Sequence, residues 1–207
     1  TEQNATSGLW GDEEYPAITG LSLRAILGDP ARKNGDKYSA VLDKGYSFIL
    51  SKTQSDGGIY GKGLASYNTS ICLMALLQRK KPEYKPIILK ARNFLINQQH
   101  DFDSRGKNDN VFDGGIGYGA RWAHSDLSNS HLAMEALFYT KKMIETEEGD
   151  KLDLDWAAAI AFVEKCQNLP GSNKEKWVSE DPADRGGFVY FPGSSMAGER
   201  KLADVKV

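Results

Sequence analysis

Few residues in this sequence combine the types and the spacing that catalysis requires. Asp101 and Asp103, separated by Phe102, have the composition of a diphosphate-binding acidic cluster. They lie in the charged stretch 101–109, and aspartate is common in polar turns. We therefore expect a solvated loop here, with diphosphate binding as the alternative.

The histidines and cysteines show no catalytic or metal-binding pattern. His124 and His131 flank the start of an expected helix, but no nucleophile or paired carboxylate has a diagnostic spacing to them. We therefore expect His131 to be a packed or helix-capping residue and not a catalytic base. Cys72 and Cys166 fall on apolar helix positions, which favours buried free thiols over a disulfide. The sequence lacks CxxC and similar ligand spacings, and we expect neither a metal site nor a cofactor.

Glycine-dense segments recur along the chain, at residues 8–11, 56–61, 113–119 and 185–190. None has GxGxxG or Walker spacing, so tight turns explain them without a bound phosphate. The first three are each followed by an apolar helix. Aligning Ala25, Ala75 and Ala136 registers these helices with offsets of 50 and 61 residues. Such a period is typical of an array of helical pairs.

The elements that position these turns are two alternating kinds of helix. One kind has a clear polar face and the other is apolar nearly all round, which predicts two concentric layers with the apolar helices inside. The fold class expected is all-α, an α/α toroid built by helices at 16–27, 39–53, 66–79, 86–98, 126–142 and 154–167.

Composition excludes two classes of partner. The 207 residues have a formal net charge of −2, with both signs interspersed, so no basic face for nucleic acid is expected. No run of about 18 apolar residues exists, which excludes a transmembrane helix from the sequence. The chain has no initiator Met and no signal peptide, which fits either a mature exported product or a piece of a longer protein; the compartment stays open.

The repeated segments resemble those of the squalene cyclases, which share an α/α toroid with the protein prenyltransferase β subunits. The cyclase repeat runs from a basic and a small residue through an aromatic–aliphatic pair and a glutamine to Gly-x-Trp. Similar copies are Lys44-Gly45, Phe48-Ile49, Gln54 and Gly58-Ile59-Tyr60; Lys90-Ala91, Phe94-Leu95, Gln99 and Gly115-Ile116-Gly117; Ala159, Phe162-Val163, Gln167 and Gly187-Phe188-Val189; and, for the tail alone, Gln3 with Gly8-Leu9-Trp10. In that family the glutamine caps helix ends.

The resemblance implies one toroid-type repeat domain over residues 1–207. A closed toroid needs more than the roughly three helical pairs of this sequence, and both ends fall within repeats. We therefore expect a fragment of a longer protein, with the alternative that two copies complete each other through their open repeat ends.

The same resemblance locates where activity would lie. Cyclases begin an inner helix with Asp-x-Asp-Asp, and here only Asp126 is retained at that position. Prenyltransferases bind zinc through Asp, Cys and His, the His lying where Asn129 stands, and Cys72 has no matched partners. Neither the acid motif nor the zinc set is visible, so enzymatic activity stays undecided.

Helical register then assigns side chains to the cavity and its rim. Arg24, Met74 and Glu135 share one register position, and we expect Arg24 and Glu135 to pair or to mark the polar end of a ligand site, with separate hydration as the alternative. The face with residues 130, 134, 137 and 138 should pack on the outer helices. Further cavity candidates are Tyr67, Asp126, Ser128 and Asn129, and rim candidates are Trp10, Tyr60, Tyr118, Trp122 and His124.

Three functions follow from these expectations. The first is binding of a small-molecule or lipid-like ligand in a mixed polar and apolar cavity between inner helices. The second is a cyclase- or lyase-type enzyme whose catalytic acid lies outside this chain. The third is a non-catalytic structural array of helices. Fold analogy does not decide among them.

Overall fold

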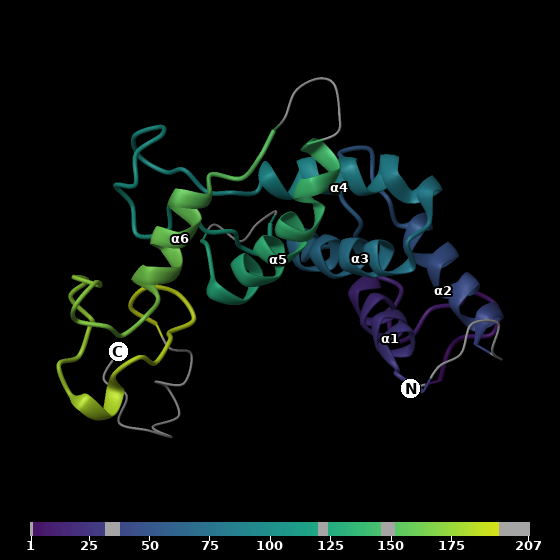
Figure 1. The fold of residues 1–207 in the computed structure, drawn as a ribbon, viewed down its shortest axis with the longest axis horizontal. Helices are drawn as coiled ribbons and strands as arrows, with labels where there is room; N and C mark the ends of the chain where they lie inside the picture. Colours follow the sequence, from purple (N-terminus) through teal and green to yellow (C-terminus); the bar gives the residue numbers. More distant parts are fainter. Residues whose placement is uncertain (1, 32–37, 120–123, 146–151, 195–207) are drawn as a thin grey trace. The chain divides into compact units, whose positions relative to one another are not determined.

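The protein is helical, as the sequence predicts. The structure, a computed structural model, describes residues 2–31, 38–119, 124–145 and 152–194. In these ranges the helices are α1 (Pro16–Gly28), α2 (Ser39–Ser51), α3 (Ala65–Arg79), α4 (Lys85–Ile96), α5 (Leu127–Glu145) and α6 (Trp156–Lys165), with short 3-10 helices η1 (Pro82–Tyr84) and η2 (Pro182–Asp184) (Figure 1). The same ranges hold isolated bridges but no strand. The all-α prediction is confirmed, with each α-helix within three residues of its expected bounds.

The chain divides into two compact units. The described residues of Thr1–Gln98, Tyr118–Arg121 and Leu132–Asp153 form unit 1, and those of Gln99–Gly117, Trp122–His131 and Leu154–Val207 form unit 2. Helix α5 begins in unit 2 and continues into unit 1. The prediction of one repeat domain over the whole length stays a prediction. No described helix has the length and apolarity needed to cross a bilayer.

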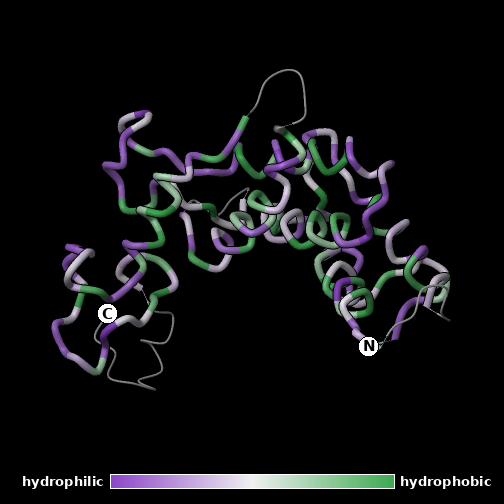
Figure 2. Tube along the Cα trace, viewed as in Figure 1, coloured by the Kyte–Doolittle hydropathy of each residue, from purple (hydrophilic) through white to green (hydrophobic). Residues whose placement is uncertain are grey.

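Unit 1 is organised around α3, which packs against α1 and α4, while α1 also packs against α2. Ten of the fifteen residues of α3 are buried, as expected of a helix poor in charge. Figure 2 shows apolar segments running through α3 and α4. Each large aliphatic side chain that is fully buried here, such as Leu73 or Leu76, stabilises the fold by about 1.5–3 kcal/mol. Unit 2 has its own cluster, in which Phe162, Cys166 and Val189 are buried.

The expected packing of one α5 face is only partly right. Ser130 and Leu137 are buried, but Phe138 has 64% of its surface exposed, so the prediction is wrong for that residue. Leu137 and Phe138 are neighbours on the helix and point about 100° apart. Leu137 is wholly buried, and Arg92 of α4 donates to its carbonyl, whereas the Phe138 side chain points into solvent.

One hydrogen bond repeats in three copies and fixes the register. The backbone N–H groups of Trp10 and Ile59 donate to the hydroxyls of Thr19 and Thr69, each at 2.9 Å, and Ile116 N–H donates to Ser130 Oγ at 2.8 Å. The three acceptors are 50 and 61 residues apart, which are the offsets predicted from the sequence. Each hydroxyl therefore ties a glycine turn to the helix that follows it.

The repeated glutamines bond the same turns. Gln3 Nε2 donates to Gly8 O and to Val41 O in the first turn of α2. Gln99 Nε2 donates to Gly114 O and Asp155 O, and its Oε1 accepts from Asp155 N at the start of α6. Backbone carbonyls left without a donor would destabilise the turn, so these glutamines satisfy the backbone as well as joining neighbouring elements.

The glycines of the turns were expected to abut the next helix, and two of three do. A Cβ on Gly58 would lie 3.1 Å from the Phe94 ring, and one on Gly115 would lie 2.8 Å from the Phe162 ring. Gly187 is the exception, because its nearest described neighbour is Asp184 O at 3.4 Å. The prediction is wrong for Gly187, because among the described residues only the end of the preceding 3-10 helix η2 lies beside it, and no following helix does.

Both cysteines are free and buried, as predicted. Burial raises the pKa of the Cys72 thiol well above its usual range and raises that of Cys166 to about 12. Neither thiol is therefore a nucleophile at neutral pH.

Candidate functional site

The charged pair expected from the register is present in unit 1. Arg24 of α1 and Glu135 of α5 approach to 3.5 Å between Nη2 and Oε1. Their side chains are 28% and 29% exposed, so both remain in contact with water. The prediction that they pair is confirmed. An ion pair this exposed contributes only about 0–1 kcal/mol to stability.

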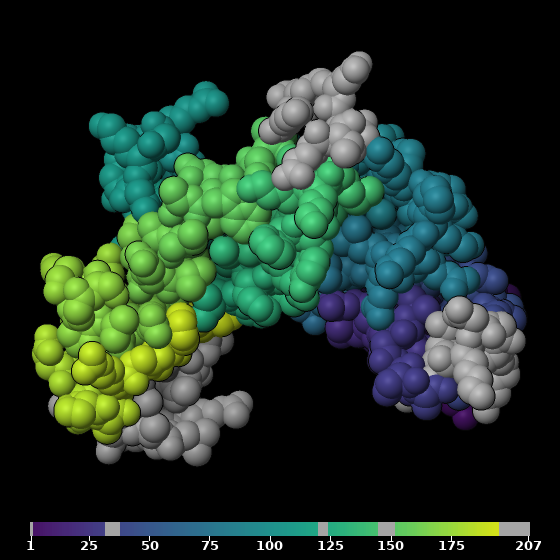
Figure 3. All heavy atoms as spheres, in the orientation of Figure 1, coloured from purple at the N-terminus to yellow at the C-terminus, as the bar shows by residue number. Residues whose placement is uncertain are grey.

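A hollow of about 400 Å³ lies beside this pair. Its lining comes from three helices of unit 1 and consists of Arg24, Met74, Leu77, Gln78 and Tyr139. Gln78 Nε2 donates to Arg24 O at 3.3 Å, which holds the α3 and α1 walls together. Figure 3 shows atoms of α1, in purple, next to those of α5, in green. We call this site the Arg24 hollow.

The Arg24 hollow is mixed in chemistry. Met74, Leu77 and the Tyr139 ring provide apolar surface, whereas Arg24 is the only charged side chain among the described residues that line it. Tyr139 is 59% exposed and stacks edge-on against Phe138, with ring centroids 5.6 Å apart. Exposed aromatic side chains beside a hollow mark binding surfaces more often than isolated apolar residues do.

The other cavity candidates lie elsewhere. The Tyr67 ring packs at a tilt against Tyr118 in unit 1, with ring centroids 6.3 Å apart, and Ser128 is exposed in unit 2. Asp126 and Asn129 are buried together in unit 2, where the Asp126 carboxylate accepts from Asn129 N at 2.8 Å and from Asn129 Nδ2 at 2.7 Å. Burial raises the pKa of Asp126, and the bonds from Asn129 oppose that rise. Asp126 thus caps the first turn of α5.

Most of the rim candidates take part in local packing. Trp10 is buried. The Tyr60 hydroxyl donates to Asp56 Oδ2 at 2.7 Å, and burial together with that carboxylate raises the pKa of Tyr60 to about 12. His124 packs at a tilt against Phe112 and Phe191, with ring centroids 5.9 and 4.8 Å away, and these two rings also contact each other. Trp122 lies outside the described residues.

A serine–histidine contact in unit 2 was not predicted. Ser125 Oγ lies 2.9 Å from His100 Nδ1 and donates to Phe112 O at 2.7 Å. Since the hydroxyl proton goes to Phe112 O, His100 donates through Nδ1. Burial lowers the pKa of His100, and nearby His124 lowers it further, whereas Asp113 opposes the shift. Ser125 is wholly buried, so the contact holds the loop and does not present a nucleophile.

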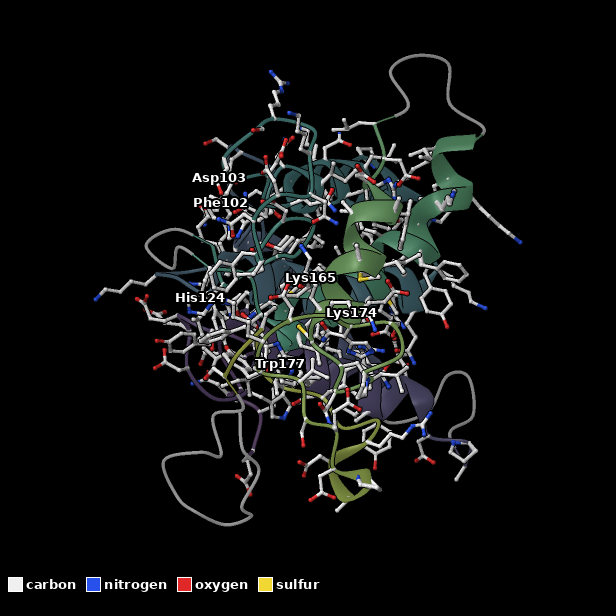
Figure 4. The ribbon with its side chains drawn as sticks, turned by 90° about the vertical axis from the view of Figure 1, so that its left-hand side faces the viewer. Phe102, Asp103, His124, Lys165, Lys174 and Trp177 are labelled. Carbon is white, nitrogen blue, oxygen red and sulfur yellow. The ribbon has the colours of Figure 1, made fainter. Side chains whose placement is uncertain are left out.

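The acidic loop of unit 2 satisfies its own carboxylates. Asp101 accepts from Gly106 N at 2.9 Å, and Asp103 Oδ2 accepts from Asn110 Nδ2 at 3.1 Å. Lys165 Nζ donates to Asn108 Oδ1 and Asn110 O, each at 3.0 Å, which ties the loop to α6; Figure 4 shows Lys165 with Phe102 and Asp103 above it. These bonds are those of a polar turn, in agreement with the solvated-loop interpretation.

A buried arginine was also missed. Arg92 of α4 has no exposed surface and donates to Leu137 O at 2.6 Å, to Thr140 Oγ1 at 2.8 Å and to Asp153. Burial lowers its pKa, and Asp153 opposes that effect. The signal in the sequence was weak, because the carboxylate partner is 61 residues away.

No model of a known protein family matches this chain, and the curated proteins include none with detectable similarity to it. The resemblance to cyclases and prenyltransferases therefore rests on the repeated residues themselves. Within the described ranges, no group of three or more His, Cys, Asp and Glu side chains is arranged to hold a metal ion.

Proposed function

We propose that this chain is a section of an α/α toroid of the cyclase and prenyltransferase type, and that it binds an anionic amphiphile in the Arg24 hollow. The observation that carries the proposal is the half-buried Arg24 at the edge of a hollow whose other described lining residues are uncharged and largely apolar. In a toroid the inner helices face the central cavity, and α1, α3 and α5 are the helices that line this hollow.

The head group of the ligand is assigned by charge. Arg24 meets Glu135 at 3.5 Å, which is longer than a charge-assisted hydrogen bond. Because the pair is exposed and weak, a ligand carboxylate or phosphate displaces Glu135 at little cost. A guanidinium has five donors and binds such groups in a bidentate manner, so Arg24 is suited to both oxygens of an anionic head.

The body of the ligand is assigned by the remaining walls. Met74 is flexible and adapts to irregular apolar shapes, and Tyr139 provides a ring with a polar tip. Burying about 150 Å² of apolar ligand surface against them contributes roughly 4 kcal/mol. The hollow is large enough for a chain or ring system of small-ligand size.

The alternative enzyme function has less support. Asp126, the one retained acid of the cyclase pattern, is buried and accepts both Asn129 donors. A proton donor to an alkene must reach the substrate, so an active cyclase would need its acid on repeats outside this chain.

The test uses two amphiphiles of equal chain length, decyl phosphate and decyltrimethylammonium, titrated calorimetrically into the full chain. Arg24→Gln should weaken decyl phosphate at least tenfold, and Glu135→Gln should tighten it, because Arg24 loses its competing partner. The cationic probe should show neither effect. Tyr139→Ala should weaken both probes, since its ring contacts the shared apolar part.

Arg79→Gln is the matched control, because Arg79 forms an ion pair with Asp43 in the same unit at 2.7 Å and does not line the hollow. Circular dichroism of each variant checks folding. If decyl phosphate binds equally to the native chain, Arg24→Gln and Tyr139→Ala, or does not bind at all, the proposed function is wrong and the structural array becomes the better interpretation.

A further inference from the structure

Arg24 and Glu135 compensate each other's charge without forming a hydrogen bond. Their Nη2 and Oε1 atoms are 3.5 Å apart, whereas a charge-assisted hydrogen bond is about 2.7–2.9 Å long. Arg79 and Asp43 of the same unit reach 2.7 Å and are hydrogen-bonded. Among the described residues, neither the Arg24 guanidinium nor the Glu135 carboxylate has a hydrogen-bond partner. The donors of one and the acceptors of the other therefore remain for a third group.

A purely anionic head group uses only one of these two charges. It binds the Arg24 guanidinium, but the Glu135 carboxylate then stands next to a second negative charge. Both side chains are less than one-third exposed, so water screens this repulsion only in part. A head group that carries both signs compensates both residues and leaves the site neutral.

An aromatic ring lies beside the Glu135 carboxylate on α5. Tyr139 follows Glu135 by four positions, so their side chains are neighbours on one face of the helix, with Cβ atoms about 5–6 Å apart. Tyr139 also lines the Arg24 hollow, and the Phe138 ring meets it at 80°. A carboxylate next to an aromatic face suits a quaternary ammonium, which is attracted by the charge and by the ring.

We propose that the ligand of the Arg24 hollow is a zwitterionic amphiphile with a head group of the phosphocholine type. Its phosphate binds Arg24, and its quaternary ammonium lies between Glu135 and Tyr139. Its alkyl chain follows Met74 and Leu77, which line the hollow. The inference rests on the proposed function and names the head group of the same ligand.

The spacing of charges supports this class of head group. In phosphocholine two carbons join the phosphate to the ammonium, so opposite charges lie side by side, as those of Arg24 and Glu135 do. Both residues belong to helices of this chain, α1 and α5, so their distance does not depend on any further repeat.

The test is calorimetric titration of the full chain with decyl phosphate and decylphosphocholine, which have equal alkyl chains, below their critical micelle concentrations. The native chain should bind decylphosphocholine about tenfold more tightly, because both charges and the ring are then used. Phosphocholine without a chain should bind more weakly than decylphosphocholine. If it binds as tightly, the head group comes from a free small molecule, and the lipid-like chain is wrong.

Glu135→Gln gives the decisive comparison, because it should act on the two probes in opposite directions. It should weaken decylphosphocholine about fivefold, since the ammonium loses its carboxylate, and it should tighten decyl phosphate, since the repulsion is gone. Tyr139→Leu keeps apolar surface and removes the ring, so it should weaken decylphosphocholine roughly threefold and leave decyl phosphate nearly unchanged. Tyr139→Phe keeps the ring and should bind both probes as the native chain does.

Asp43→Asn is the matched control, because it removes the carboxylate of an arginine pair in the same unit that does not line the hollow. It should change neither probe, and circular dichroism checks the folding of every variant. Opposite effects of Glu135→Gln on the two probes support the zwitterionic head group. If Glu135→Gln leaves decylphosphocholine unchanged or tightens both probes, the zwitterionic head group is wrong, while anion binding by Arg24 still stands. If neither probe binds the native chain, the proposed function is wrong and the head group with it.

Discussion

Replacing Gly114 and Gly186 by alanine, one at a time, separates the backbone cost of a glycine turn from its packing cost. The two residues have φ angles of +83° and +84°, so alanine is strained equally at both. A left-handed conformation costs a non-glycine residue about 1–2 kcal/mol. They differ in what a Cβ meets, because it would lie 2.1 Å from Ala158 O at Gly114 and has no described neighbour within 4 Å at Gly186.

The steric part follows from the contact distance. Carbon and oxygen pack without strain at roughly 3.5 Å, so α6 must move by more than an ångström to admit the methyl group that Gly114→Ala adds. Overpacking of this kind costs typically about 1–3 kcal/mol. We therefore expect Gly186→Ala to lower the free energy of unfolding by about 1–2 kcal/mol and Gly114→Ala by about 2–5 kcal/mol.

Urea unfolding followed by circular dichroism gives both values. Both glycines lie in unit 2, so the same cooperative transition reports them. The slope of free energy against urea should stay unchanged, which shows that only stability has moved. Equal destabilisation by the two substitutions would refute the reasoning, because it would mean that the contact of Gly114 with α6 has no energetic consequence.

Two further predictions concern buried charge and pH. Asp153→Asn should destabilise the protein by about 3–5 kcal/mol, because it leaves the Arg92 guanidinium buried without its carboxylate. Adding Arg92→Met should recover part of that loss, which thermal unfolding measures. A double variant that is no more stable than Asp153→Asn would contradict this prediction. The pKa of His100 is lower in the folded protein than its ordinary value of 6.5, so the unfolded state binds a proton at His100 more readily. The contribution of His100 to the stability of the fold is therefore fully present above pH 6.5 and is lost as the pH falls through the lower pKa of the folded state. His100→Gln should reduce that dependence on pH, and an unaltered pH profile would exclude His100 as its source.

The helices were predictable because their signals are local. Pro16 occupies the first turn of α1 and apolar residues recur at helical spacing, so each start and stop is set by neighbouring residues. The register was predictable because Thr19, Thr69 and Ser130 stand at the same offsets as the alanines used for alignment. Repetition therefore supplied tertiary information that a single helix lacks.

The site was predictable only where register sufficed. Arg24 and Glu135 were expected to meet because they occupy one position of the repeat. The contacts of Arg92 with Asp153 and of His100 with Ser125 depend on where loops of irregular length return, and no periodicity encodes that. The predicted packing of Phe138 was wrong for a related reason. A helical wheel gives the direction of a side chain but not how far the neighbouring element extends.

The repeat itself indicates which positions are available for function. Residues 19, 69 and 130 all carry a hydroxyl, because in each copy this hydroxyl accepts a hydrogen bond from the equivalent backbone N–H of the turn. The position at residues 24, 74 and 135 holds instead a cation, a thioether and a carboxylate. A packing contact that recurs in every copy would require similar side chains at this position. The repeated packing therefore does not determine these three side chains. Arg24 and Met74 line the same hollow and Arg24 pairs with Glu135, so the side chains at this position differ where the repeated packing leaves them undetermined.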